Sequence, residues 1–153
     1  MIMDHKLKLM VVDDSPLFRT WLIRSLSEDD RFQVVGYAVN ALDAQEKIPL
    51  LQPDMLTLDI EMPGMSGIEF LKQLLPVHPI PVILVSSLNL RVFDALEAGA
   101  VDFVRKPDEA NGLSKEIFLS MLRSKLLVAA ASHVHLPSVP ASPQAAKKRI
   151  VSP

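Results

Sequence analysis

The chain has 153 residues, of which 16 are Lys or Arg and 18 are Asp or Glu, so its formal net charge is -2 at pH 7. This length fits one domain with a core of its own, and the balanced charge excludes a global field that would draw the molecule to nucleic acid or an anionic membrane. The sequence holds no cysteine, which excludes disulfides, zinc thiolate sites and a cysteine nucleophile. The charged start and the lack of an apolar run of about 18 residues predict a cytoplasmic protein without membrane insertion.

Short apolar runs alternate with longer stretches of helical periodicity along most of the chain. The predicted strands are Leu9–Val12, Phe32–Ala38, Met55–Leu58, Pro81–Val85 and Ala100–Val104. The predicted helices are Pro16–Ser27, Ala41–Leu50, Ser66–Leu75, a short piece around Arg91–Ala98, and Leu113–Ala131. The strands are mostly apolar without alternation, so we expect all of them to be buried on both faces. This order predicts an α/β fold, a doubly wound five-stranded parallel sheet in a flavodoxin-like three-layer sandwich.

Two helix ends carry recognisable signals. Ser15 and Pro16 supply an N-cap and a first-turn proline directly after an acidic pair. Gly99 is the expected C-cap of the fourth helix. The first helix therefore begins beside the acidic pair, with its N-terminal dipole favouring a bound anion.

The composition changes after Ala131. Residues 132–153 are rich in Pro, Ser and Ala and include the basic run Lys147–Arg149. We interpret residues 1–131 as one domain and residues 132–153 as a linker to a domain that this sequence does not contain, or else a short natural tail. His133 and His135 are read as ordinary linker residues, because no other metal ligands accompany them.

Four of the predicted strands end in residues that could contact a phosphoryl group. Asp13 and Asp14 follow the first strand, Asp59 the third, Ser86 the fourth and Lys106 the fifth. Because the carboxyl ends of parallel strands face one crevice, these side chains can meet in a single site. Three carboxylates, a hydroxyl and an ammonium suit a magnesium ion and a covalent aspartyl phosphate.

Each of these residues also has a plainer interpretation. Asp13 and Asp14 could be solvated loop acids, and Asp59 could cap the next helix. Ser86 could be a helix cap and Lys106 a solvated loop lysine. Against this, a carboxylate after a buried strand is costly unless it has a role, and a Lys106–Pro107 bond, trans or cis, would hold the lysine out of the helical region.

Several motifs together resemble one known family. Val-Val-Asp-Asp-Ser, Leu-Asp-Ile-Glu-Met-Pro-Gly-Met-Ser-Gly, Val-Ser-Ser-Leu and Ala-Gly-Ala-Val-Asp-Phe-Val-Arg-Lys-Pro occur in this order. The set is similar to the response-regulator receiver domain of two-component signalling over about residues 7–130. Within that family, the sequence around the third, fourth and fifth strands looks most like the receivers of the chemotaxis protein-glutamate methylesterases, CheB.

The resemblance implies a role for each strand-end residue. Asp59 would accept a phosphoryl group from the phosphohistidine of a histidine kinase. Asp13, Asp14 and the backbone carbonyl of Glu61 would join Asp59 in holding Mg²⁺, which would be the cofactor. Ser86 and Lys106 would contact the phosphoryl oxygens.

The resemblance also implies how a signal would leave the site. Phe103 occupies the position of an aromatic side chain that moves together with the residue at Ser86. The receiver would then regulate a C-terminal effector domain or another protein target. Whether a methylesterase domain follows Pro153 is open, so enzymatic activity is expected only of the longer protein.

Two positions depart from the family pattern, and two alternative functions stay open. The interval from Ser86 to Lys106 is about one helical turn short, which predicts a clipped fourth helix. Ser66 stands where an aspartate is usual, which should alter only a turn.

The alternative functions are a stand-alone receiver that acts as a partner-binding module or phosphate sink, and an aspartate-nucleophile phosphatase of the haloacid-dehalogenase type. Such phosphatases place an Asp-x-Asp nucleophile first, unlike this chain.

Overall fold

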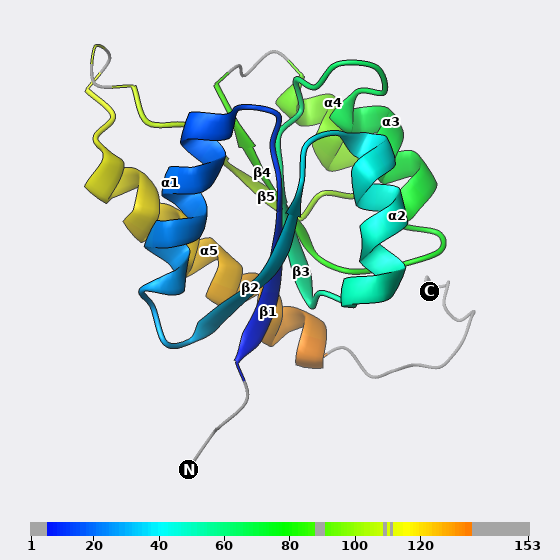
Figure 1. Ribbon diagram of the computed structural model, residues 1–153, viewed down its shortest axis with the longest axis horizontal. Helices are drawn as coiled ribbons and strands as arrows, with labels where there is room; N and C mark the ends of the chain where they lie inside the picture. Colours follow the sequence, from blue (N-terminus) through cyan, green and yellow to red (C-terminus); the bar gives the residue numbers. More distant parts are fainter. Residues whose placement is uncertain (1–5, 88–90, 109, 111, 136–153) are drawn as a thin grey trace, which may run out of the picture.

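The computed structural model describes residues 6–87, 91–108, 110 and 112–135, which form a parallel sheet covered by helices on both faces (Figure 1). The strands are β1 Leu7–Val12, β2 Phe32–Ala38, β3 Met55–Leu58, β4 Val82–Ser86 and β5 Asp102–Arg105. The helices are α1 Pro16–Ser27, α2 Ala41–Leu51, α3 Gly67–Leu74, α4 Val92–Glu97 and α5 Lys115–His135. The five strands are ordered β2-β1-β3-β4-β5 and all neighbours are parallel. The predicted fold class is confirmed.

The sheet divides the core into two apolar layers. Successive residues of a strand face opposite sides, so Leu9 and Val11 of β1 join a cluster with α1 and α5. Met10 and Val12 join the other cluster, with α2, α3 and α4. Figure 1 shows α1 and α5 on one side of the sheet and the other three helices opposite.

The prediction that every strand is buried on both faces is right for the central strands and wrong at the edges. All residues of β3 and β4 are buried. In β2 and β5, which form the two edges of the sheet, most side chains are partly exposed, and Tyr37 is 44% exposed. An edge strand has a neighbour on one side only, so the covering helices leave part of it in water.

Most predicted helix ends are confirmed within a few residues. The C-cap of α4 is Ala98 rather than the predicted Gly99. Gly99 follows it with a φ of 120°, which glycine tolerates, and its N–H donates to Leu96 O. Ser15 is the N-cap of α1, but its side chain makes no capping hydrogen bond. The fourth helix has six residues, as the short interval predicts. The described residues contain no cis peptide bond, so the Lys106–Pro107 bond is trans.

The last helix is longer than the sequence predicts. Helix α5 runs to His135 rather than ending at Ala131, so the predicted end of the helix is wrong and the backbone of His133 and His135 is helical. The domain boundary after Ala131 stays a prediction. Leu127, Ala129 and Ala130 continue the apolar face of the helix, and the two alanines are buried in the core layer that α1 and α5 form with the sheet. Residues 136–153, and with them the remainder of the predicted linker and its basic run, lie outside the described residues, as do residues 88–90.

A polar cluster ties α5 to the loop between α1 and β2. The Arg123 guanidinium of α5 donates to Ser25 O at 3.0 Å and lies 3.6 Å from the Asp29 carboxylate. Arg31 donates two hydrogen bonds to the same carboxylate, at 2.9 and 2.6 Å. These hydrogen bonds, above all those from Arg31, lower the pKa of Asp29 from 3.8 to about 2.

The Asp29 cluster gives a pH-dependent stability. Because the folded carboxyl has the lower pKa, its stabilising effect is complete above about pH 4 and is lost as the pH falls toward 2. We expect Asp29→Asn to lower the free energy of unfolding at pH 6, and the gap to wild type to close between pH 4 and pH 2. Urea unfolding at several pH values measures this, with Asp30→Asn, which removes an exposed neighbouring carboxylate, as control. A gap that stays constant with pH would contradict the prediction.

Candidate functional site

The strand-end residues are positioned by the sheet's own hydrogen-bond ladder. The N–H of Asp13 donates to Ala38 O of β2 at 3.0 Å, and the N–H of Asp59 donates to Val12 O of β1 at 3.0 Å. At the other side of the sheet, the N–H of Lys106 donates to Ser86 O at 2.9 Å. Each residue therefore lies one step past its strand, with its backbone still held by the neighbouring strand.

The two buried carboxylates share one hydrogen-bonding pattern. Asp13 Oδ1 accepts from the N–H of Ser15 at 2.8 Å, and Asp59 Oδ1 accepts from the N–H of Glu61 at 3.0 Å. In both cases the donor is the backbone two residues on, as in an Asx-turn. One oxygen of each carboxylate is thus fixed by its own turn, and the second oxygen, Oδ2, is directed to a shared partner.

That shared partner is the ammonium of Lys106. Its Nζ lies 3.0 Å from Asp13 Oδ2 and 3.4 Å from Asp59 Oδ2. Neighbouring strands are about 4.8 Å apart, so a side chain at the end of β5 must pass the end of β4 to reach β3. The flexible four-carbon stem of lysine spans this distance. The prediction that Lys106 could be a solvated loop lysine is wrong, because its side chain is only 15% exposed.

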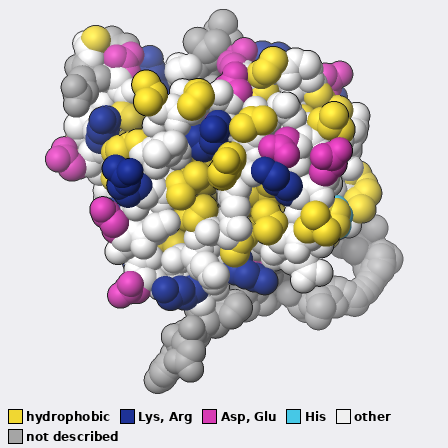
Figure 2. Space-filling model, viewed as in Figure 1, with side chains coloured by type: hydrophobic (Ala, Val, Ile, Leu, Met, Phe, Trp, Pro, Cys, Tyr) yellow, Lys and Arg dark blue, Asp and Glu magenta, His cyan; other side chains and the backbone are white. Residues whose placement is uncertain are grey.

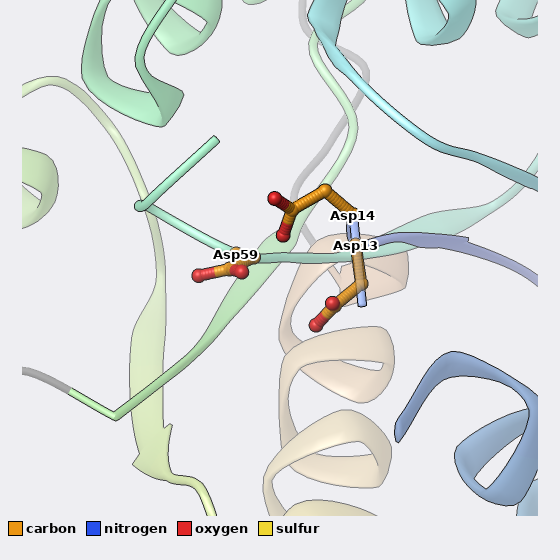
Figure 3. A group of neighbouring side chains, drawn as sticks. All are labelled: Asp13, Asp14 and Asp59. Carbon is orange, nitrogen blue, oxygen red and sulfur yellow. The ribbon is translucent and has the colours of Figure 1, made fainter. Parts of the chain in front are cut away.

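Three carboxylates gather around this point. Oxygen atoms of Asp13, Asp14 and Asp59 all lie within 4.8 Å of one another, and Figure 3 shows the three side chains grouped at the ends of β1 and β3. Asp13 and Asp59 are 2% and 5% exposed, whereas Asp14 faces solvent. An all-oxygen set of this kind fits a hard divalent cation. The interpretation as solvated loop acids is therefore wrong for Asp13.

The electrostatic state of Asp59 follows from its burial. The pKa of this carboxyl is raised from 3.8 to about 6, mainly by burial and in addition by the nearby Asp13. Lys106 and the N–H of Glu61 act in the opposite direction without cancelling the effect. The ionised Asp59 is thus held at a cost in free energy, as is common for functional carboxylates.

The loop after Asp59 is pinned by the start of α3. Gly67 donates to Ile60 O at 3.0 Å, and a Cβ on Gly67 would lie 2.9 Å from Asp59 O, so only glycine fits there. Ser66 and Glu69 form a capping box, in which Ser66 Oγ accepts from the N–H of Glu69 at 3.2 Å. Ser66 is therefore the N-cap of α3, and the predicted turn into a helix is confirmed.

The remaining predicted residues lie on β4 and β5. Ser86 is the last residue of β4 and is 2% exposed, so its predicted place at the strand end is confirmed. Phe103 lies within β5 and is half-buried. Lys125 of α5 donates to Phe103 O at 2.8 Å and to Asp102 Oδ1 at 3.1 Å, and its Nζ lies 5.3 Å from the centroid of the Phe103 ring.

The structure adds two residues that sequence reasoning did not assign to the site. Arg19 of α1 donates to Asp13 O at 2.8 Å, and the ring of Phe18 lies 4.5 Å from Lys106 Nζ. Both belong to the first turns of the helix that begins after the acidic pair, which was the available signal. The Glu61 carbonyl as a cation ligand stays a prediction.

Comparisons with known proteins point to one family. The family described as the response regulator receiver domain matches residues 9–118. A protein-glutamate methylesterase/protein-glutamine glutaminase of Syntrophomonas wolfei is 46% identical over 130 residues, which are 85% of this chain and 38% of that protein. The corresponding protein of Vibrio vulnificus is 43% identical over 137 residues, 87% of this chain and 40% of that protein. The chain spans about two fifths of the length of these relatives.

Solved structures agree with this. The response regulator domain of Thermotoga maritima CheB is 37% identical, with a TM-score of 0.76 over 83% of this chain and 98% of that domain. A chain from the complex of the CheA3 P1 domain with CheY6 of R. sphaeroides is 28% identical, with a TM-score of 0.68 over 82% of this chain and 97% of that one. The protein belongs to the response regulator receiver domains, and within them it is similar to the receivers of CheB-type methylesterases.

Proposed function

We propose that this domain is a phosphorylation-controlled regulator in which Asp59 is the phosphoacceptor. The observation that carries the proposal is the largely enclosed Lys106 ammonium, shared between Asp13 Oδ2 and Asp59 Oδ2. A phosphoryl group on Asp59 would place its oxygens beside this cation, and the ladder already fixes the three residues relative to one another. The family assignment supports this role over that of a haloacid-dehalogenase-type phosphatase.

The chemical step is the transfer of a phosphoryl group from the donor to the carboxylate of Asp59. An oxygen of Asp59 forms a bond to phosphorus while the bond from phosphorus to the donor's imidazole nitrogen breaks, and the electron pair leaves with the imidazole. With acetyl phosphate the leaving group is acetate. Asp59 Oδ1 is held by the N–H of Glu61, so the nucleophile keeps its orientation while Lys106 binds the incoming negative charge.

Asp13, Asp14 and Asp59, with the Glu61 carbonyl, are the residues that would hold Mg²⁺. Bound there, the ion would supply positive charge against the carboxylates and the phosphoryl oxygens. Asp13 is suited to direct contact because it is buried and fixed by Ser15, whereas the exposed Asp14 can act directly or through water.

Ser86 and Phe103 are proposed as the switch that reads the phosphoryl group. Ser86 ends β4 directly beside Lys106, with which it shares a backbone hydrogen bond. Phe103 lies in β5, three residues before Lys106, and its backbone oxygen accepts a hydrogen bond from Lys125 of α5. A dianionic group that draws the Ser86 hydroxyl would thus act on an element linked to α5.

The partners follow from the same proposal. The phosphodonor is a histidine kinase, and the target is a C-terminal effector, which we propose to be a protein-glutamate methylesterase domain beyond Pro153; the stand-alone receiver is the alternative. On the face of the described residues seen in Figure 2, Lys and Arg side chains are interspersed with Asp and Glu, which supports a protein partner over nucleic acid. No described helix is long and apolar enough to cross a membrane. We expect the protein to act in the cytoplasm, with which its lack of cysteine is consistent.

Covalent labelling tests the role of Asp59. Incubation of the chain with Mg²⁺ and acetyl phosphate should add one phosphoryl group, measured by intact-mass spectrometry, and Asp59→Asn should abolish the addition. Asp30→Asn should label like wild type. Beryllofluoride, a phosphoryl analogue, should also change the fluorescence of Trp21, whose ring lies 5.7 Å from that of Phe18. Labelling that survives Asp59→Asn would refute the assignment.

The raised pKa of Asp59 predicts a stability cost in the metal-free protein. The folded carboxyl binds its proton more tightly than the unfolded one, so the free energy of unfolding should fall as the pH rises from about 4 to 7. In EDTA at pH 7, Asp59→Asn should therefore be more stable than wild type, by about 3 kcal/mol at most, with the difference vanishing near pH 4. Urea unfolding measures the difference. Equal stabilities at pH 7 would show that Lys106 compensates the burial fully.

The proposed effector gives a third test. A chain extended by the sequence encoded after Pro153 should hydrolyse protein glutamate methyl esters, and beryllofluoride should raise the rate. Asp59→Asn should keep the basal rate and lose the increase. A different output domain after Pro153 would refute the methylesterase assignment, and the absence of any further domain would leave the stand-alone receiver as the correct alternative.

A further inference from the structure

Lys106 has a third partner that carries no charge. Its Nζ lies 4.5 Å from the centroid of the Phe18 ring, in addition to its contacts with Asp13 and Asp59. Phe18 lies in the first turn of α1, four residues after Asp14, and is half-buried. The ammonium is therefore enclosed by two carboxylates and the face of an aromatic ring, and only 15% of the lysine side chain is exposed.

An aromatic ring differs from a carboxylate as a partner for the lysine. The face of the ring attracts an ammonium through its quadrupole, and the attraction strengthens where water is excluded. A ring does not bind a divalent cation of this kind and is not itself phosphorylated. When Mg²⁺ or a phosphoryl group binds to Asp13 and Asp59, the contacts of Lys106 with these carboxylates change. Its contact with the Phe18 ring does not need to change.

The ring itself is held in place by neighbours on two helices. It lies 5.7 Å from the ring of Trp21 on α1 and 5.9 Å, edge to face, from that of Phe118 on α5. Phe118 is 2% exposed and belongs to the core layer between α1, α5 and the sheet. The orientation of Phe18 is thus set by the packing of α1 against α5, and a rigid ring face is offered to Lys106.

We propose that Phe18 is a positioning residue for Lys106, holding the ammonium where it meets the phosphoryl oxygens on Asp59. The inference rests on the proposed function and deepens it. Phe18 touches neither the phosphoryl group nor the metal ligands' oxygens in this role. It acts by limiting the places that the flexible lysine side chain can occupy once its contacts with the carboxylates change.

This role predicts a split between two affinities. Mg²⁺ is held by carboxylate oxygens, so its affinity does not need Phe18. Beryllofluoride, whose fluorines stand for the phosphoryl oxygens, needs the ammonium in place. Loss of the ring face should therefore lower the affinity for beryllofluoride about three- to tenfold, while the affinity for Mg²⁺ stays within about twofold or rises slightly. A general loosening of the fold would lower both affinities.

The experiment uses the 153-residue chain and isothermal titration of Mg²⁺, then of beryllofluoride at saturating Mg²⁺. Phe18→Leu keeps an apolar side chain and removes the ring. Pentafluorophenylalanine at position 18 keeps the shape and reverses the quadrupole, and it serves where Phe18→Leu folds poorly. Phe32→Leu is the matched control, because it removes a buried ring from the same core layer but not one that packs on Phe18 or Lys106.

A double-mutant cycle separates the contact from its surroundings. In a Lys106→Met background, Phe18→Leu should cause no further loss of beryllofluoride affinity, because the ammonium is already gone. The inference is supported if both Phe18 changes weaken the binding of beryllofluoride but not of Mg²⁺, and Phe32→Leu weakens neither. It is overturned if the pentafluorophenylalanine variant binds beryllofluoride like wild type, if Phe32→Leu has the same effect as the Phe18 changes, or if the losses add in the cycle.

Failure of the inference and failure of the proposed function give different results. If wild type binds beryllofluoride and Asp59→Asn does not, the function stands, and the Phe18 variants decide the inference alone. If wild type binds no beryllofluoride at saturating Mg²⁺, the proposed function fails and the inference fails with it.

Discussion

The site depends on one ammonium placed between two buried carboxylates. Asp13 and Asp59 lie side by side because β1 and β3 are neighbours in the sheet, and both are almost inaccessible to water. Removing two like charges from water is costly, and a cation in direct contact compensates part of that cost. Lys106 supplies the cation across the end of β4. The rest of the structure can be understood as what holds these three residues at hydrogen-bonding distance.

The support is built from short-range features. The backbone of each residue continues the ladder of a neighbouring strand, the following turns fix one oxygen of each carboxylate, and Gly67 lets α3 pack against the loop after Asp59. The Lys106 ammonium compensates the cost of burying the Asp59 carboxylate only in part, since the pKa of Asp59 is still raised to about 6. Under the proposed function, a divalent cation and a phosphoryl group would relieve the remaining cost when they bind, and this gain would be the thermodynamic basis of the switch.

Two routes lead from the site to the surface formed by α5. One follows β5, where Lys125 joins the backbone and ring of Phe103 to the helix. The other runs through the aromatic contacts from Phe18 to Phe118 on the same helix. The six-residue α4 contributes less surface than a longer helix would, so α5 is the larger element that both routes share.

The sequence by itself determined the fold class, the chain order of the elements and four of the residues that meet, Asp13, Asp14, Asp59 and Lys106. This was possible because apolar runs mark strands and because parallel strands end at one edge. Only the tertiary structure decided which strands are edges, that α5 extends to His135, and that Lys106 also rests on Phe18. All three findings depend on which segments become neighbours in the fold. The apolar pattern of a helix is the same whether one of its aromatic rings packs on a core leucine or on the ammonium of a lysine.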